Sequence, residues 1–129
     1  MRTILFRGKD IETGQWLYGY YSKNTTGTWP LKDVIYPSAD AEAGFLHYEE
    51  ISPVTLGQYI GATDYDNTPI FEGDVVDLFG ERYLIVYLEK AQRFAPAKPN
   101  GTIGNFDIGL CVVVGNIHDN PELMEAKLE

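Results

Sequence analysis

The amino-acid sequence predicts an all-β fold with one short helix near the C-terminus, and three observations support this prediction. The chain contains nine Tyr, six Phe and two Trp residues, and aromatic residues are enriched in strands. Thirteen Gly and seven Pro residues divide the sequence into short segments joined by turns. Several of these segments alternate polar and apolar residues, as strands with one buried face do.

The length and the charge of the chain limit the classes of protein to consider. A length of 129 residues suits one domain or two small ones, and an apolar fraction of 44% allows a core. Ten basic and nineteen acidic residues give a net charge of −9. Because Lys and Arg supply most of the affinity for nucleic acid, we expect no direct binding of DNA or RNA.

The cysteine count and the hydropathy pattern indicate a cytoplasmic protein. Cys111 is the single cysteine, so the chain has no internal disulfide, which fits a reducing compartment. No segment approaches the run of about 20 apolar residues that a membrane span needs. Residues 1–7 lack the pattern of a secretion signal.

The N-terminal residues predict a β-hairpin. Residues 2–8 and 15–22 each alternate in the manner of a strand, and a turn at residues 10–14 joins them. Gly19 lies inside the second strand, which indicates a bulge or a close backbone approach. One face of this strand carries aromatic residues: Trp16, Tyr18 and Tyr20.

Residues 23–53 give a mixed pattern. Short strands are expected near residues 28–36 and 45–51, with a small acidic loop at residues 37–44. Such a pattern suits an extended arm that becomes ordered against another subunit. We therefore expect this region to assist oligomerisation.

The chain divides at Pro53 into an N-terminal part, residues 1–53, and a C-terminal part, residues 54–129. The C-terminal part has about five short strands, which suits a small SH3-like barrel. A two-residue turn at Gly80-Glu81 is expected to form a hairpin, and residues 94–104 are expected to form a loop. Strands are expected at residues 54–60, 74–79, 82–90 and 107–117.

The predicted helix begins at residues 119–123. Asn120 is a favourable N-cap, and Pro121 suits the first helical position. A helix of this length is unstable alone, so we expect it to pack on the sheet.

The acidic residues between Gly57 and Val76 offer two kinds of site. The run from Asp64 to Asn67 resembles the start of a calcium loop, but Pro69 and Val75 stand where an EF-hand needs Gly and Glu. An EF-hand is therefore excluded. Asp and Asn also satisfy the backbone of turns, so we favour a structural role, with a weak ion site as the alternative.

Glu72, Gly73 and Asp74 allow two interpretations. Two nearby carboxylates are able to act in acid–base catalysis when a cleft gives them different environments. A tight turn before a strand needs the same residues, with Gly73 for its backbone and Asp74 as its cap, and we favour this structural role. The same stretch also supplies turn and core positions, at Tyr59, Gly61, Ile70 and Phe71.

Cys111 is the single candidate thiol nucleophile, and His47 and His118 are the candidate bases. Its neighbours include Leu110 and Val112, and a buried thiol packs as a small hydrophobic side chain with a raised pKa. Two histidines and one cysteine are too few for a structural zinc site. We expect no metal and no cofactor.

Three stretches of the chain resemble motifs of the YopX family of phage and prophage proteins, in the same order and spacing. They are Met1–Lys9 followed by Gly14–Gly19, then Gly57–Gly61 with Ile70–Val76, then Gly115–Leu123. The family often has a Lys- and Gly-rich turn where this chain has residues 64–69. That turn therefore lacks the family's positive charge in this chain.

The resemblance implies a β protein with an SH3-like C-terminal part and an N-terminal part that assists oligomerisation. It implies expression from phage or prophage genes inside a bacterial cell. The family has no established enzymatic activity, so the resemblance supplies no catalytic residue.

Three hypotheses about function follow. The first is a non-enzymatic, oligomeric accessory protein that also contacts a host or phage protein. The second is an acidic decoy that binds a basic host protein. The third is an enzyme that uses the carboxylates of Asp64, Glu72 or Asp74, with or without a metal ion.

Overall fold

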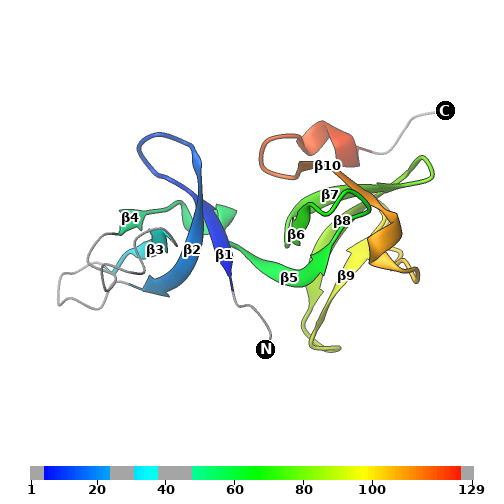
Figure 1. Cartoon of the computed structure of the whole chain (residues 1–129), viewed down its shortest axis with the longest axis horizontal. Helices are drawn as coiled ribbons and strands as arrows, with labels where there is room; N and C mark the ends of the chain where they lie inside the picture. The colour runs from blue at the N-terminus through cyan, green and yellow to red at the C-terminus, as the bar shows by residue number, and fades with distance from the viewer. Residues whose placement is uncertain (1–4, 24–30, 38–47, 126–129) are drawn as a thin grey trace. The chain divides into compact units, whose positions relative to one another are not determined.

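The computed structural model describes residues 5–23, 31–37 and 48–125. Within these residues the chain is mostly β, and its strands pair in an antiparallel manner. This confirms the prediction of a mainly β protein. The chain divides into two units, Met1–Tyr59 and Ile60–Glu129, which Figure 1 shows.

Unit 1 begins with the predicted hairpin of β1 (Phe6–Lys9) and β2 (Trp16–Lys23). In the turn, the Asp10 carboxylate accepts a hydrogen bond of 2.8 Å from the N–H of Glu12. The N–H of Gly14 donates to the carbonyl of Asp10 at 2.9 Å, and Gly14 has a φ of 73°. The hairpin and its turn are therefore confirmed, although residues 1–4 lie outside the described residues.

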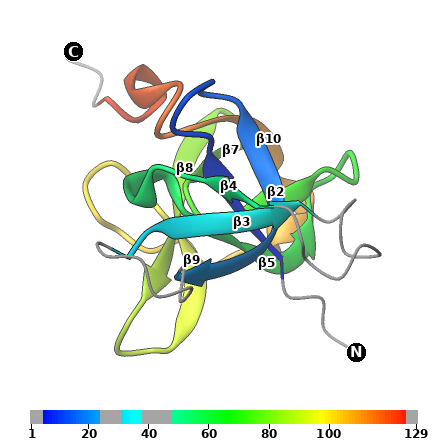
Figure 2. The same cartoon turned by 90° about the vertical axis from the view of Figure 1, so that its left-hand side faces the viewer.

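Two further strands extend this sheet. β3 (Asp33–Pro37) pairs with β2, and β4 (Glu49–Glu50) pairs with β3. Figure 2 shows β3 between β2 and β4. The predicted middle strands are thus present in shortened form, while residues 24–30 and 38–47, most of the predicted arm, lie outside the described part.

Gly19 is required by the close pairing of β2 and β3. A Cβ atom on Gly19 would lie 1.9 Å from the carbonyl oxygen of Tyr36. The prediction of a close backbone approach at Gly19 is confirmed. On the same face as Gly19, Ile35 is fully buried, and the neighbouring Ile51 is also buried, so this side forms the core of unit 1.

β5 (Gly57–Thr63) runs through the boundary between the units. Its first residues pair with β1, where Arg7 faces Gly57, and its later part lies beside β6 (Pro69–Phe71) in unit 2. The predicted strand at residues 54–60 therefore starts too early. Pro53–Thr55 instead form a 3-10 turn, because Pro53 takes its first position.

Unit 2 contains a four-stranded sheet in the order β10-β7-β8-β9. The bounds are β7 (Asp74–Leu78), β8 (Glu81–Leu88), β9 (Arg93–Ala97) and β10 (Val112–Asn116). Its two outer strands do not pair with each other, so the described residues do not form a closed barrel. The core consists of Ile70, Val76, Tyr83, Ile85 and Cys111.

The β7–β8 hairpin turns one residue earlier than predicted. Glu81 already pairs with Leu78, so the two turn residues are Phe79 and Gly80 rather than Gly80 and Glu81. Phe79 has a φ of 51° and Gly80 a φ of 89°, as in a type I′ turn. A bulky apolar residue at the first of these positions is uncommon, and the sequence rules for turns do not predict it.

The segment predicted as a loop at residues 94–104 begins as a strand instead. β9 pairs with β8 along its length, and Ile85 faces Pro96. Proline lacks an N–H donor, so it is tolerated in strands at the edge of a sheet, where β9 lies. Pro96 therefore misled the prediction.

The predicted long strand at residues 107–117 is shorter than expected, because a 3-10 turn at Ile108–Leu110 takes the place of its first part and the strand begins at Val112. The Asp107 carboxylate accepts a hydrogen bond of 2.9 Å from the N–H of Gly109 and caps this turn. The apolar run continues through the turn, so hydrophobicity alone did not reveal the break.

The predicted C-terminal helix is wrong. Pro121–Met124 form a single 3-10 turn, and Glu125 returns to extended backbone. Pro121 takes the first position as predicted, but the side chain of Asn120 accepts a hydrogen bond of 3.3 Å from the N–H of Asn116 and does not cap the turn. No helix in the described ranges is long and apolar enough to cross a membrane.

Candidate interaction surface

An aromatic surface covers one side of the unit 1 sheet. Alternate residues of a strand share a face, and directly paired residues on neighbouring strands do as well. Tyr20 pairs with Tyr36, whose ring lies 5.6 Å from that of Tyr48. We call this surface the aromatic face, and its members are Trp16, Tyr18, Tyr20, Tyr36 and Tyr48.

The aromatic face is substantially exposed to solvent. The relative exposure is 43% for Tyr18, 46% for Tyr20 and 39% for Tyr48. Large aromatic side chains gain free energy when they leave water, and contiguous exposed apolar patches mark interaction sites. This surface is therefore the best candidate site of unit 1.

Two cations belong to the aromatic face. Arg7 pairs with Tyr18 and Lys9 with Trp16. The guanidinium carbon of Arg7 lies 4.6 Å from the centroid of the Trp16 ring, and the Nζ atom of Lys9 lies 5.5 Å from it. Such cation–π contacts contribute about 0.5–1 kcal/mol at exposed sites and more where the cation is buried, as Arg7 is. Arg7 is buried and Lys9 is half-buried, so Lys9 supplies the accessible positive charge of this face.

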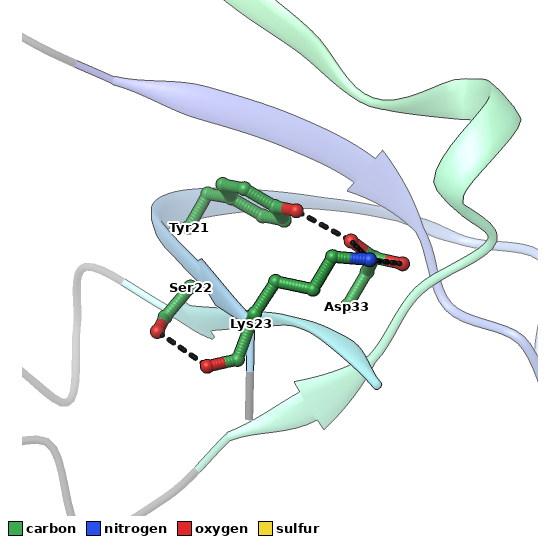
Figure 3. Close-up of polar contacts among 4 residues, drawn as sticks. All are labelled: Tyr21, Ser22, Lys23 and Asp33. Atoms are coloured by element: carbon green, nitrogen blue, oxygen red, sulfur yellow. Dashed lines mark hydrogen bonds and ion pairs between the residues drawn. The ribbon is translucent and has the colours of Figure 1, made fainter. Parts of the chain in front are cut away.

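On the other side of the sheet, Tyr21, Lys23 and Asp33 form a polar cluster, which Figure 3 shows. The Tyr21 hydroxyl donates a hydrogen bond to the Asp33 carboxylate. The Nζ atom of Lys23 lies 3.3 Å from the same carboxylate. These contacts tie β2 to β3 just before residues 24–30, where the described part of the sheet ends.

The electrostatics of this cluster suit it to hold β2 and β3 together rather than to transfer protons. Burial and the hydrogen bond to Asp33 raise the pKa of Tyr21 to about 12. The hydrogen bond from Tyr21 lowers the pKa of Asp33 more than burial raises it, and Lys23 lowers it further. Near neutral pH the phenol therefore stays protonated and the carboxylate stays charged.

In unit 2, Asp64 connects two distant segments. One carboxylate oxygen accepts hydrogen bonds of 2.8 Å from the N–H groups of Asp66 and Thr68, and the other accepts one of 2.9 Å from Val113. Burial opposes ionisation of Asp64, but these donors outweigh it and hold the pKa of this carboxyl group below its ordinary value. The structural role predicted for Asp64 is confirmed.

Gly73 and Asp74 form the predicted tight turn before β7. Gly73 has a φ of 92°, and the Asp74 carboxylate accepts a hydrogen bond of 2.8 Å from the N–H of Phe71. Gly73 also donates to the carbonyl of Ile85 at 2.9 Å and accepts from Ile117 at 2.8 Å. Asp74 and Phe71 are both buried, in agreement with cap and core positions.

Cys111 is fully buried, as predicted from its apolar neighbours. Its thiol donates to the carbonyl of Ile108 at 2.8 Å. Burial, and to a smaller extent the charge of Asp64, raises the pKa of the thiol to about 11. The structure places the ring of His118 beside Gly73, and His47 lies outside the described residues.

The remaining predicted residues occupy structural positions. Tyr59 is half-buried, and its N–H donates to the carbonyl of Leu5 at 2.7 Å. Gly61 has a φ of 89° inside β5, a conformation that glycine adopts without strain. Asn120 and Pro121 begin the last 3-10 turn. A role of any of these residues in subunit contacts stays a prediction.

Sequence reasoning placed Trp16, Tyr18 and Tyr20 on one face, and the structure brings them together there. The sequence did not predict that Arg7 and Lys9 lie on the same side as these aromatic residues, although the two cations alternate along the first strand. Their place opposite the aromatic residues depends on the register of the hairpin, which the turn length sets. Among the described histidine, cysteine and acidic residues, no group of three or more is arranged to hold a metal ion.

Comparison with known proteins agrees with this fold. The chain is similar to the crystal structure of protein EF1440 from Enterococcus faecalis, with a TM-score of 0.55 and 20% sequence identity over 97% of this chain and 100% of that chain. No curated protein matches the sequence. The model of the YopX protein family matches residues 5–125, which include both the aromatic face and the turns at Asp64 and Gly73. On this match over nearly its whole length, the chain belongs to the YopX family.

Proposed function

We propose that this protein is a non-enzymatic interaction protein that forms homo-oligomers through the aromatic face of unit 1. The observation that carries this proposal is the exposure of three tyrosines on one sheet surface beside the half-buried Lys9. Tyr, Trp and Arg are enriched in protein interfaces, where they supply most of the binding free energy.

The bonding of the candidate catalytic groups supports a non-enzymatic role. The carboxylates of Asp64 and Asp74 accept backbone hydrogen bonds within turns. The Cys111 thiol is buried and has a raised pKa, whereas a nucleophilic cysteine needs a lowered one. Each of these groups thus has a role in the fold that accounts for its presence.

The family resemblance supports the biological setting of the proposal. It favours expression from phage or prophage genes, the cytoplasm of a bacterial cell, and a host or phage protein as a further partner. It also favours an SH3-like origin for the open sheet of unit 2, which has the short strands and tight turns of that class.

Light scattering after size-exclusion chromatography tests the proposed assembly. The wild-type protein is expected to show a mass above that of the 14.5 kDa monomer, and a Tyr18→Ser, Tyr20→Ser variant is expected to show a lower mass. Tyr87→Ser is the matched control, because Tyr87 is 38% exposed and lies on β8 in unit 2. A strictly monomeric wild type at all concentrations would refute the proposal.

The acidity of the chain supports a second candidate function, the capture of a basic host protein. The net charge is −9, and long-range attraction between opposite charges accelerates association. A pull-down from bacterial lysate at low and high salt tests this function. A partner that is basic and is released by salt supports it, and a partner that survives high salt contradicts it.

A further inference from the structure

The three most exposed of the large apolar side chains of unit 2 are Tyr65, Phe79 and Leu110. The relative exposure is 72% for Tyr65, 90% for Phe79 and 51% for Leu110. They belong to three separate segments, namely the turn before β6, the β7–β8 turn and the 3-10 turn before β10.

The hydrogen bonds bring these three segments to one end of the sheet. The N–H of Tyr65 donates to the carbonyl of Cys111 at 2.8 Å, and Leu110 precedes Cys111. Val112 pairs with Asp77, which lies two positions before Phe79. We call this surface the apolar tip and define it by Tyr65, Phe79 and Leu110.

Phe79 is the most informative member of the apolar tip. Its φ of 51° lies in the left-handed region, where a residue with a large side chain is strained relative to glycine. Asn or Gly is preferred at this turn position. Because Phe79 is also almost fully exposed, neither backbone geometry nor burial accounts for a phenylalanine there.

The apolar tip is surrounded by negative charge. Within three positions of its members, the sequence has five acidic residues and a single basic one, Arg82. The Nζ atom of Lys98 also lies 3.8 Å from the Glu81 carboxylate. The acidic residues are Asp64, Asp66, Asp77, Glu81 and Asp107. Asp64 is buried, so the charge at the surface comes from the other four.

The two units also differ in net charge, and unit 2, which carries the apolar tip, is the more negative. Residues 1–59 contain seven acidic and five basic residues, a net charge of −2. Residues 60–129 contain twelve acidic and five basic residues, a net charge of −7. The basic residues of unit 1 include the buried Arg7 and the half-buried Lys9, which lie on the side of the aromatic face.

We propose that the apolar tip of one copy binds the aromatic face of a second copy. The proposal rests on the proposed homo-oligomer and identifies the two surfaces that form its interface. Phe79, Tyr65 and Leu110 meet aromatic rings, while the exposed acidic residues around the tip face Lys9, the half-buried cation of the aromatic face. Because the two surfaces differ, the contact is head-to-tail, and copies associate into a closed ring or an open chain.

Two variants with opposite defects test this pairing. The tip variant is Phe79→Asn, which suits the left-handed turn and therefore preserves the hairpin. The face variant is Tyr18→Ser, Tyr20→Ser. By light scattering, each variant alone is expected to be monomeric, because it lacks one half of every interface. An equimolar mixture is expected to contain dimers, since the tip of the face variant still fits the face of the tip variant.

Controls separate loss of binding from loss of folding. Circular dichroism tests whether both variants are folded. If Phe79→Asn is unfolded, Leu110→Ser serves as a second tip variant. Val54→Asn is the matched control, because Val54 is an exposed apolar residue outside both surfaces, with a relative exposure of 79%. It is expected to assemble as the wild type does.

Each remaining outcome overturns the inference. If the wild type is oligomeric and Phe79→Asn assembles normally, the tip is not an interface, while the proposed homo-oligomer stands. If the mixture of variants stays monomeric, or if the face variant assembles alone, the tip does not bind the aromatic face. A monomeric wild type refutes both this inference and the proposed function.

Discussion

At the scale of single residues, buried polar groups act as connectors in this protein. Asp64 joins the turn before β6 to β10 through three backbone hydrogen bonds, across a sequence separation of 49 residues from Val113. Removal of a buried acceptor leaves its donors without a partner, which is more costly than the gain from forming the bond.

Asp64→Asn is therefore expected to lower the free energy of unfolding by about 1–3 kcal/mol. The amide NH₂ group faces at least one backbone N–H in either orientation, so a donor meets a donor. Urea unfolding measures the change, and Asp66→Asn is the control because Asp66 is exposed. Equal stability of the two variants would contradict the connector role.

The low pKa of Asp64 also predicts a pH dependence. The folded-state pKa lies below that of the unfolded chain, so the carboxylate stabilises the fold above the unfolded pKa of about 3.9. This contribution is lost as the pH falls through the folded pKa. Comparison of wild type and Asp64→Asn at pH 7 and pH 3 should show a smaller difference at pH 3.

Cys111 is expected to react with a thiol reagent only after unfolding. Its folded pKa of about 11 leaves little thiolate at pH 8, and the side chain is buried. Because the folded pKa is raised, the thiol contributes stability below its unfolded pKa, and this contribution is lost as the pH rises through about 11. Rapid labelling of the native protein at pH 8 would contradict this prediction.

At the scale of elements, the β1–β2 hairpin was predictable and the last helix was not. Alternation and a glycine turn are local signals, and they defined the hairpin and the face that carries Tyr18. The bond from Asn116 to Asn120 replaces a helix cap, and it depends on how the chain folds back after β10. Local sequence rules do not contain such information.

The candidate site was also only partly predictable from the sequence. The aromatic residues of β2 were visible from sequence, but Tyr36 and Tyr48 joined them through pairing between strands. The apolar tip was not visible, because its three members come from distant segments and Phe79 occupies a turn position where it is not expected.

Gly19→Ala tests the pairing of β2 and β3. The added Cβ atom would overlap the carbonyl oxygen of Tyr36, so the strands must separate, with an expected loss of about 3 kcal/mol. Gly80→Ala is the control, because its Cβ atom meets open space and only its φ of 89° is unfavourable. Hydrogen exchange in β3 should accelerate in the first variant and not in the second.

At the scale of the whole molecule, charge acts in two opposite directions. The net charge is −9, so the acidic residues within each copy repel one another, and added salt screens this repulsion. Salt also screens the proposed attraction between the acidic tip and Lys9 of the aromatic face. The monomeric Phe79→Asn variant is therefore expected to gain thermal stability in salt, while the wild-type assembly dissociates more readily.

A series of thermal melts and light-scattering measurements from low to high salt checks both effects. If salt strengthens the assembly, burial of apolar surface dominates the interface, and the charges around the tip do not select the partner surface.

The path of β5 has a consequence for how such genes diversify. The boundary between the units falls within this strand. Its first residues pair with β1 in unit 1, and its later residues lie beside β6 in unit 2. Recombination between two relatives at this boundary joins half-strands from different parents. The product keeps both pairings only if the two halves preserve strand length and side-chain alternation. Inheritance of the two units is therefore linked through the geometry of a single seven-residue strand.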